Sequence, residues 1–162
     1  MEICSKALKY GDDISTDLII AGKYSKTLSA EELAMHAMED LDPDFTQKVK
    51  TASVLVAGEY FGRGSSREAA PCALLEAGVS CVIAKSFARI FYRNAINVGL
   101  PILECDTDLI SEGDTIQYTL GADHVLNETT GNRISVAPLP EIMVEIFKSG
   151  GLVQHFIKHG DF

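Results

Sequence analysis

The apolar residues form three short runs that alternate with segments of helical period. The runs cover residues 52–58, 81–86 and 100–105, and they are rich in Val, Ile and Leu without polar alternation. Such runs are typical of strands that are covered on both faces. Between the last two runs, Ser86–Val98 has the helical period and ends before Gly99, a natural helix stop. The short connections imply right-handed parallel crossovers, with strands and helices alternating.

The helical segment Ser86–Val98 is predicted to have two faces. An apolar face carries the residues that we expect in the core: Phe87, Ile90, Phe91, Ala95 and Val98. A second face carries Arg89, Arg93 and Asn97 at spacings of four residues. Arg89 or Arg93 could aid the site, or the helix could form part of a subunit contact or a structural salt-bridge face; for both arginines we favour the structural role.

The pattern changes after Asp106. Residues 113–120 and 124–139 indicate short antiparallel strands with a turn at residues 130–132. Residues 140–151 predict a helix with proline in its first turn and glycine at its end. The last segment, residues 152–162, predicts another short helix or a tail.

The N-terminal part predicts a polar loop that becomes apolar, followed by a helix. The loop begins at Gly11 and a short segment from Gly22 is expected to be mobile. Ser29 with Glu32 has capping-box spacing and begins a helical pattern that continues to Leu41. The chain shows no internal repeat, linker or low-complexity region, so residues 1–162 are predicted to form a single α/β domain.

Composition excludes several classes of function. A hydrophobic content of 46% is enough for a core, and the net charge of −9 argues against nucleic-acid binding through phosphates. The start of the chain does not resemble a signal peptide, and no run has the length of a membrane helix. The four cysteines contain no CxxC pair, so no metal site is expected, and three lie in apolar surroundings. These three are predicted to be buried thiols of a cytoplasmic protein.

The stretch "EYFGRGSSREAAP", Glu59 to Pro71, follows a predicted strand and precedes a helix. Ligands bind at this end of parallel strands. Ser65 and Glu68 have capping-box spacing, which would put Ser65 at the anion-binding start of a helix. Glycines at 62 and 64 allow close backbone approach, and the arginines at 63 and 67 add positive charge. The stretch therefore predicts a carboxylate or phosphate site, although a simple cap is the alternative for Ser65.

Other motifs in the sequence do not indicate a further functional site. Pro71 cannot occupy a regular helix interior, so either the main helix begins near Pro71 or it is kinked. P-loop and nucleophile-elbow strings are absent. A serine hydrolase would need a histidine within hydrogen-bond reach of Ser65. His155 and His159 have metal-ligand spacing without the glutamate of HExxH, and we expect them to be surface histidines.

Three stretches together carry a family resemblance. They are "GDDISTDLIIAGKY", "FGRGSSREAAP" and "VIAKSFARIFYRNAINVGLPILEC", and they span Gly11 to Cys105. In this order and spacing, the chain resembles the small subunit of 3-isopropylmalate dehydratase. It is thus similar to the swivelling domain of the aconitase superfamily, here as a free subunit.

The resemblance implies a swivelling β/β/α fold with a parallel core and a hydro-lyase reaction. A hydroxy di- or tricarboxylic acid is isomerised by dehydration and rehydration, and a [4Fe-4S] cluster acts as the Lewis acid. A separate large subunit carries the cluster, and this chain would close over the site as a lid. The expected assembly is a heterodimer or larger complex with that large subunit, and the pathway implied is leucine biosynthesis.

The resemblance also implies roles for particular residues. Ser65 matches the catalytic base, and Arg67 matches an arginine that binds a substrate carboxylate. Ser66 matches the neighbour whose backbone helps to bind the oxyanion, next to Gly64. Asp17 is expected to orient the site, with a plain turn or cap residue as an equal alternative.

The resemblance further implies that the loop "YSKT", which includes Lys26 and Thr27, recognises the variable group of the substrate. A basic residue there suits an additional carboxylate, with a solvated loop lysine as the alternative. The small subunits of homoaconitase or 2,3-dimethylmalate dehydratase are therefore alternatives to isopropylmalate dehydratase. A non-catalytic module that binds carboxylates is the alternative from another class. The role of Arg63 is left open.

Overall fold

The computed structural model describes residues 1–26 and 28–160. Its strands form one seven-stranded sheet in the order β4-β3-β2-β1-β5-β6-β7. The parallel half contains β1 (Glu2–Lys9), β2 (Val54–Val56), β3 (Cys81–Ala84) and β4 (Ile102–Glu104). The antiparallel half contains β5 (Thr115–Thr119), β6 (His124–Asn127) and β7 (Asn132–Ser135). The predicted α/β architecture is confirmed.

Strand β1 joins the two halves of the sheet. It pairs in parallel with β2, Ala7 opposite Val54, and antiparallel with β5, Glu2 opposite Thr119. The sequence analysis missed this strand, because its residues do not alternate and few are β-branched. Partners on both sides supply the hydrogen bonds that fix it as a strand despite weak local preference.

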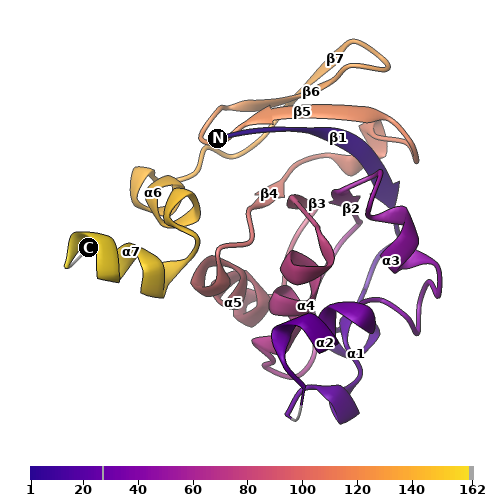
Figure 1. The fold of residues 1–162 in the computed structure, drawn as a ribbon. Coiled ribbons are helices and arrows are strands. Elements are labelled where there is room, and N and C mark those ends of the chain that lie inside the picture. The colour runs from indigo at the N-terminus through magenta and orange to yellow at the C-terminus, as the bar shows by residue number, and fades with distance from the viewer. Residues whose placement is uncertain (27, 161–162) are drawn as a thin grey trace.

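Helices α1, α2, α4 and α5 lie together below the strands, and α6 and α7 lie beside α5 (Figure 1). The helices are α1 (Thr16–Ile19), α2 (Ala30–Met35), α3 (Phe45–Lys48), α4 (Ala69–Ala77), α5 (Arg89–Val98), α6 (Glu141–Ser149) and α7 (Leu152–His159). Two 3-10 turns are η1 (Gly22–Tyr24) and η2 (Thr107–Leu109). In the described residues, no helix has both the length and the apolar character needed to cross a membrane.

Several predicted elements are confirmed, with shorter bounds. Ser29 accepts a hydrogen bond from the Glu32 amide as the capping box requires, but helix α2 ends at Met35 instead of Leu41. The chain turns there so that Met38, fully buried with φ of 59°, can donate its amide to the Ile19 carbonyl. Segment 22–28, expected to be mobile, forms the turn η1 over its first three residues.

Helix α5 ends at Gly99 in the left-handed conformation, as predicted. It begins at Arg89, three residues later than expected, and buries Phe91 and Ala95. Ile90 was expected in the core, but its side chain is 46% exposed. Because the helix begins late, Ile90 lies in its first turn.

Two predictions of burial were wrong. Of the cysteines, only Cys81 is buried; Cys72 and Cys105 are half-buried and Cys4 is exposed. Burial raises the pKa of the Cys81 thiol, and raises that of Cys105 to about 12. His155 was expected on the surface, yet it is buried, because α7 packs back on α6.

Gly62 provides a test of packing under the site. Its φ is +85°, and an added Cβ would lie 2.3 Å from Cγ of Phe91. We expect Gly62→Ala to lower the free energy of unfolding by about 2–5 kcal/mol, from the left-handed backbone and the overpacking together. Gly131→Ala is the matched control, because its φ is +80° with no atom within 4 Å.

Urea unfolding of both variants measures the difference. The control should lose only the backbone contribution, about 1–2 kcal/mol. Equal losses in the two variants would contradict the packing that we describe around Phe91.

Candidate functional site

Two loops that follow adjacent strands are joined by backbone hydrogen bonds. The Gly62 amide donates to the Ile14 carbonyl at 2.7 Å, and the Thr16 amide donates to the Arg63 carbonyl at 2.9 Å. The first loop leaves the carboxyl end of β1 and the second leaves that of β2. These bonds bring the "ISTD" and "GRGSSR" stretches together at the sheet edge where parallel α/β proteins bind ligands.

The start of α4 differs from the capping-box prediction for Ser65. The helix begins at Ala69, with Glu68 as its N-cap, so Ser65 lies in the exposed loop before it. A helix that began at Ser65 would place Pro71 in its interior, where proline lacks the required N–H and clashes with a carbonyl. In the observed helix, Pro71 lies in the first turn, which tolerates proline. The alternative that the main helix starts near Pro71 is confirmed.

The guanidinium of Arg67 is held by α1. Its Nη1 donates to Oδ1 of Asp17 and, at 3.3 Å, to the carbonyl of Ile20. The Arg67 side chain is only 19% exposed, whereas that of Asp17 is 68% exposed. Asp17 therefore contacts the guanidinium of Arg67 directly, and its orienting role at the site stays a prediction.

Gly22 makes this position of Arg67 possible. A Cβ on Gly22 would lie 3.1 Å from Nη2 and 3.4 Å from Cζ of Arg67. The guanidinium thus lies against the backbone of η1, at the start of the loop predicted to recognise the substrate. A larger residue at 22 would force Nη2 of Arg67 to shift.

An open hollow of about 330 Å³ lies in front of this arginine. Its lining joins the two predicted stretches and consists of Ser25, Lys26, Ser66, Arg67, Glu68 and Ala69. Two cations therefore face one space, as carboxylate binding would require. Thr27, predicted beside Lys26, lies outside the described residues. A hollow of about 320 Å³ between α2, α3 and α4 contains none of the predicted site residues.

The base of the Lys26 loop is anchored by an aromatic stack. The rings of Tyr24 and His36 lie 3.9 Å apart and nearly parallel, and Nδ1 of His36 lies 2.9 Å from Oε2 of Glu39. The hydrogen bond from His36 lowers the pKa of Glu39. Lys23 lies 5.1 Å from the centre of the Tyr24 ring. This cluster fixes where the Lys26 loop leaves the fold.

Gly64 lies above a buried hydroxyl. Oγ1 of Thr16 would be 3.4 Å from a Cβ on Gly64, and it has no hydrogen-bond partner among residues 1–26 and 28–160. A buried polar group without a partner costs about 1–3 kcal/mol. The free hydroxyl therefore marks a place where a ligand or a rearranged loop can gain a hydrogen bond.

The described part of the chain does not support a serine hydrolase. The ring of His36 bonds to Glu39, and that of His124 to Asp123 and Arg133, so neither is directed at Ser65. The same residues contain no cluster of three or more His, Cys, Asp or Glu side chains that could hold a metal. These side chains therefore do not fit an iron–sulfur cluster.

Sequence reasoning missed three contributors to the site: Gly22, Thr16 and His36. A single glycine between an apolar run and a lysine is a signal for close backbone approach, and it could have indicated Gly22. Nothing in the sequence marks Thr16 or His36, because their roles depend on neighbours at residues 64 and 24.

Comparison with known proteins places this geometry in a family. The model of the aconitase C-terminal domain matches residues 13–107. The 3-isopropylmalate dehydratase small subunit 2 of Archaeoglobus fulgidus is 57% identical over 99% of this chain and 98% of its own length. The small subunit of Halothermothrix orenii is 52% identical over 98% of this chain and 99% of its own.

A solved structure supports membership of the same family. The crystal structure of 3-isopropylmalate dehydratase from Methanocaldococcus jannaschii matches with a TM-score of 0.92 and 45% identity, over 99% of this chain and 96% of that one. The matched fold includes the loops that carry Asp17 and Ser65. The chain therefore belongs to the aconitase C-terminal domain family, among the small subunits of 3-isopropylmalate dehydratase.

Proposed function

We propose that this chain is the lid subunit of a cytoplasmic hydro-lyase that isomerises 3-isopropylmalate together with a large subunit. The supporting observation is that Asp17 holds Arg67 beside an open hollow, next to the exposed Ser65 loop. A site that is exposed on one chain and has no second wall fits a lid that acts only when a partner closes it.

Arg67 binds a carboxylate of the substrate in this proposal. One side of its guanidinium is occupied by Asp17 and the Ile20 carbonyl, so the remaining N–H donors can form parallel bonds to a carboxylate. Because the side chain is already mostly buried and oriented, little conformational entropy is lost on binding.

Ser65 takes the proton from the carbon next to the leaving hydroxyl, and returns a proton in the reverse step. An alkoxide is a strong enough base, provided that positive charge stabilises it. Arg67 supplies positive charge, and the backbone of Gly64 and Ser66 contributes N–H donors. The [4Fe-4S] cluster of the large subunit would supply the Lewis acid for the departing hydroxyl.

A second substrate class is favoured by Lys26, which lines the hollow together with Arg67. An ammonium group there suits a substrate with an additional carboxylate, as in the homoaconitase reaction. A 2,3-dimethylmalate substrate would leave this charge without a partner.

The proposal is tested by co-expression with the large subunit encoded by the same organism. After anaerobic reconstitution of the cluster, alkene absorbance is followed with isopropylmalate, homocitrate and dimethylmalate. Turnover that needs both chains supports the proposal. A stable complex with an intact cluster and no turnover would instead support a non-catalytic carboxylate-binding module.

Ser65→Ala should lower kcat of this complex by at least about 10²-fold, because the base is lost. Assembly should not change, since the Ser65 side chain is exposed in a loop. Ser66→Ala is the matched control, because it keeps the backbone donor and should retain most activity. Similar losses in both variants would argue against Ser65 as the base.

Gly22→Ala should lower kcat/KM by up to about 10-fold, mainly through KM, because the added Cβ would lie 3.1 Å from Nη2 of Arg67 and a shift of the guanidinium weakens its hydrogen bonds without removing them. Gly11→Ala is the control, because a Cβ there meets no atom within 4 Å. Unchanged KM for Gly22→Ala would contradict this positioning role.

Lys26→Ala should distinguish the substrates. If Lys26 binds an additional carboxylate, kcat/KM should fall at least about 10-fold for homocitrate and change little for isopropylmalate. Lys23→Ala is the control, because Lys23 lies over the Tyr24 ring and does not line the hollow. Equal effects on both substrates would show that Lys26 does not recognise this carboxylate.

A further inference from the structure

Five exposed side chains form a surface next to the site, which we call the arginine face. Its members are Tyr60, Arg63, Arg89, Ile90 and Arg93. The first two follow strand β2 and the other three belong to α5, which follows strand β3. Both segments therefore begin at the carboxyl edge of the parallel strands, the edge that also carries Ser65; Arg89 and Ile90 lie in the first turn of α5, and Arg93 lies one turn further along.

Backbone hydrogen bonds hold the two parts of this face together. The Phe61 amide donates to the Ser86 carbonyl at 3.0 Å, and the Ala88 amide donates to the Phe61 carbonyl at 2.9 Å. Beneath them, the rings of Phe61 and Phe91 pack edge to face at 5.1 Å. The arginine face is therefore a rigid part of the fold.

The charge of this face is opposite to that of the chain. The net charge is −9, yet four of the five arginines, including Arg67, lie on these two segments. Arg67 pairs with Asp17, whereas Arg63, Arg89 and Arg93 have no ion pair within residues 1–26 and 28–160. Arg89 also begins α5, where the helix dipole disfavours a cation.

The arginine face also carries two exposed apolar side chains. Tyr60 is 60% exposed and Ile90 is 46% exposed, although both are large apolar side chains. An exposed tyrosine and isoleucine between arginines have the composition of a protein interface, where tyrosine and arginine contribute most of the binding energy.

We propose that the arginine face docks on an acidic, partly apolar surface of the large subunit. This rests on the proposed function, because the lid must meet its partner at the edge that carries Ser65. Continuity with that edge identifies the occupant, and three arginines that form no ion pair in the described residues are complementary to acidic groups on such a partner. In this role the arginines steer and hold the lid without touching the substrate.

Binding of the purified large subunit is measured by calorimetry for wild type, for Arg89→Glu with Arg93→Glu, and for Tyr60→Ser. We expect Kd to rise at least about 10-fold for the double variant and for Tyr60→Ser, with a salt dependence that is weaker in the double variant.

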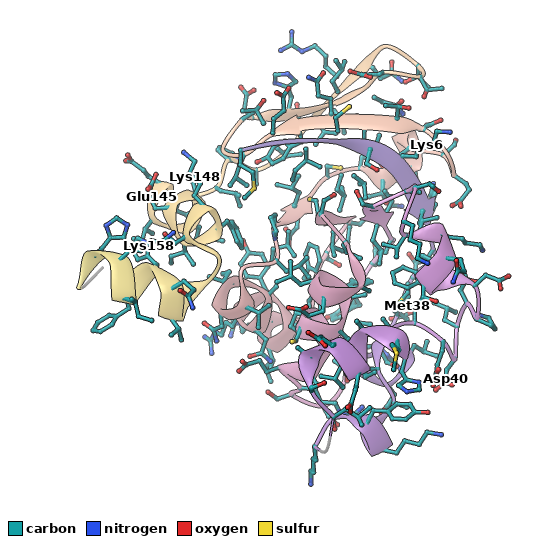
Figure 2. All side chains as sticks on the ribbon, in the orientation of Figure 1. Lys6, Met38, Asp40, Glu145, Lys148 and Lys158 are labelled. Carbon is teal, nitrogen blue, oxygen red and sulfur yellow. The ribbon has the colours of Figure 1, made fainter. Side chains whose placement is uncertain are left out.

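The control is Lys6→Glu with Lys50→Glu, which changes the net charge equally, and both lysines are exposed. Lys6 belongs to strand β1 and lies away from α5 (Figure 2), so this control should bind as wild type does.

Turnover at saturating large subunit separates docking from chemistry. For the double variant, kcat should return to near the wild-type value once the complex is saturated. If the double variant binds as wild type does, or if kcat stays low at saturation, the proposal is wrong.

Light scattering tests for another occupant of this face. If the double substitution dissociates a dimer that this chain forms alone, a second copy is the occupant and the proposal is also wrong. Wild type that fails to bind the large subunit would overturn the proposed function itself.

Discussion

The site depends on the backbone pairing between residues 11–16 and residues 58–63. The Asp13 amide donates to the Glu59 carbonyl at 2.8 Å, and the Gly58 amide donates to the Gly11 carbonyl at 3.0 Å. Two further bonds continue the pairing to Thr16 and Arg63. Because these bonds extend the parallel pairing of β1 and β2 beyond the strand ends, two loops that are distant in the sequence are held as one unit.

The positions of Asp17, Gly22 and Arg67 follow from this pairing. It places Asp17 where it can reach Arg67, and it brings Gly22 close enough that the guanidinium lies on its backbone. Along the chain, the exposed Ser65 lies between Arg63 of the arginine face and the held Arg67. Orientation is therefore supplied inside the chain, while the open hollow and the unpaired arginines leave binding and closure to a partner.

Much of the fold could be predicted because its signals are local. The runs at β3 and β4, the cap at Ser29 and the stop at Gly99 depend on residues near them in sequence. Strand β1 could not be predicted, since its strand form comes from neighbours on both sides. Burial of His155 and exposure of Ile90 also depend on how helices pack and where they begin.

The sequence by itself determined the chemistry available: a serine, two arginines and two glycines in one loop, and an aspartate and a lysine in another. Their order and spacing were sufficient to indicate the family and the reaction class. Only the tertiary structure decided that Asp17 holds Arg67, that Gly22 leaves room for it, and that Ser65 lies outside the helix. The physical reason is that these contacts join residues about 50 positions apart, and pairing between strands, which no local pattern encodes, brings them within bonding distance.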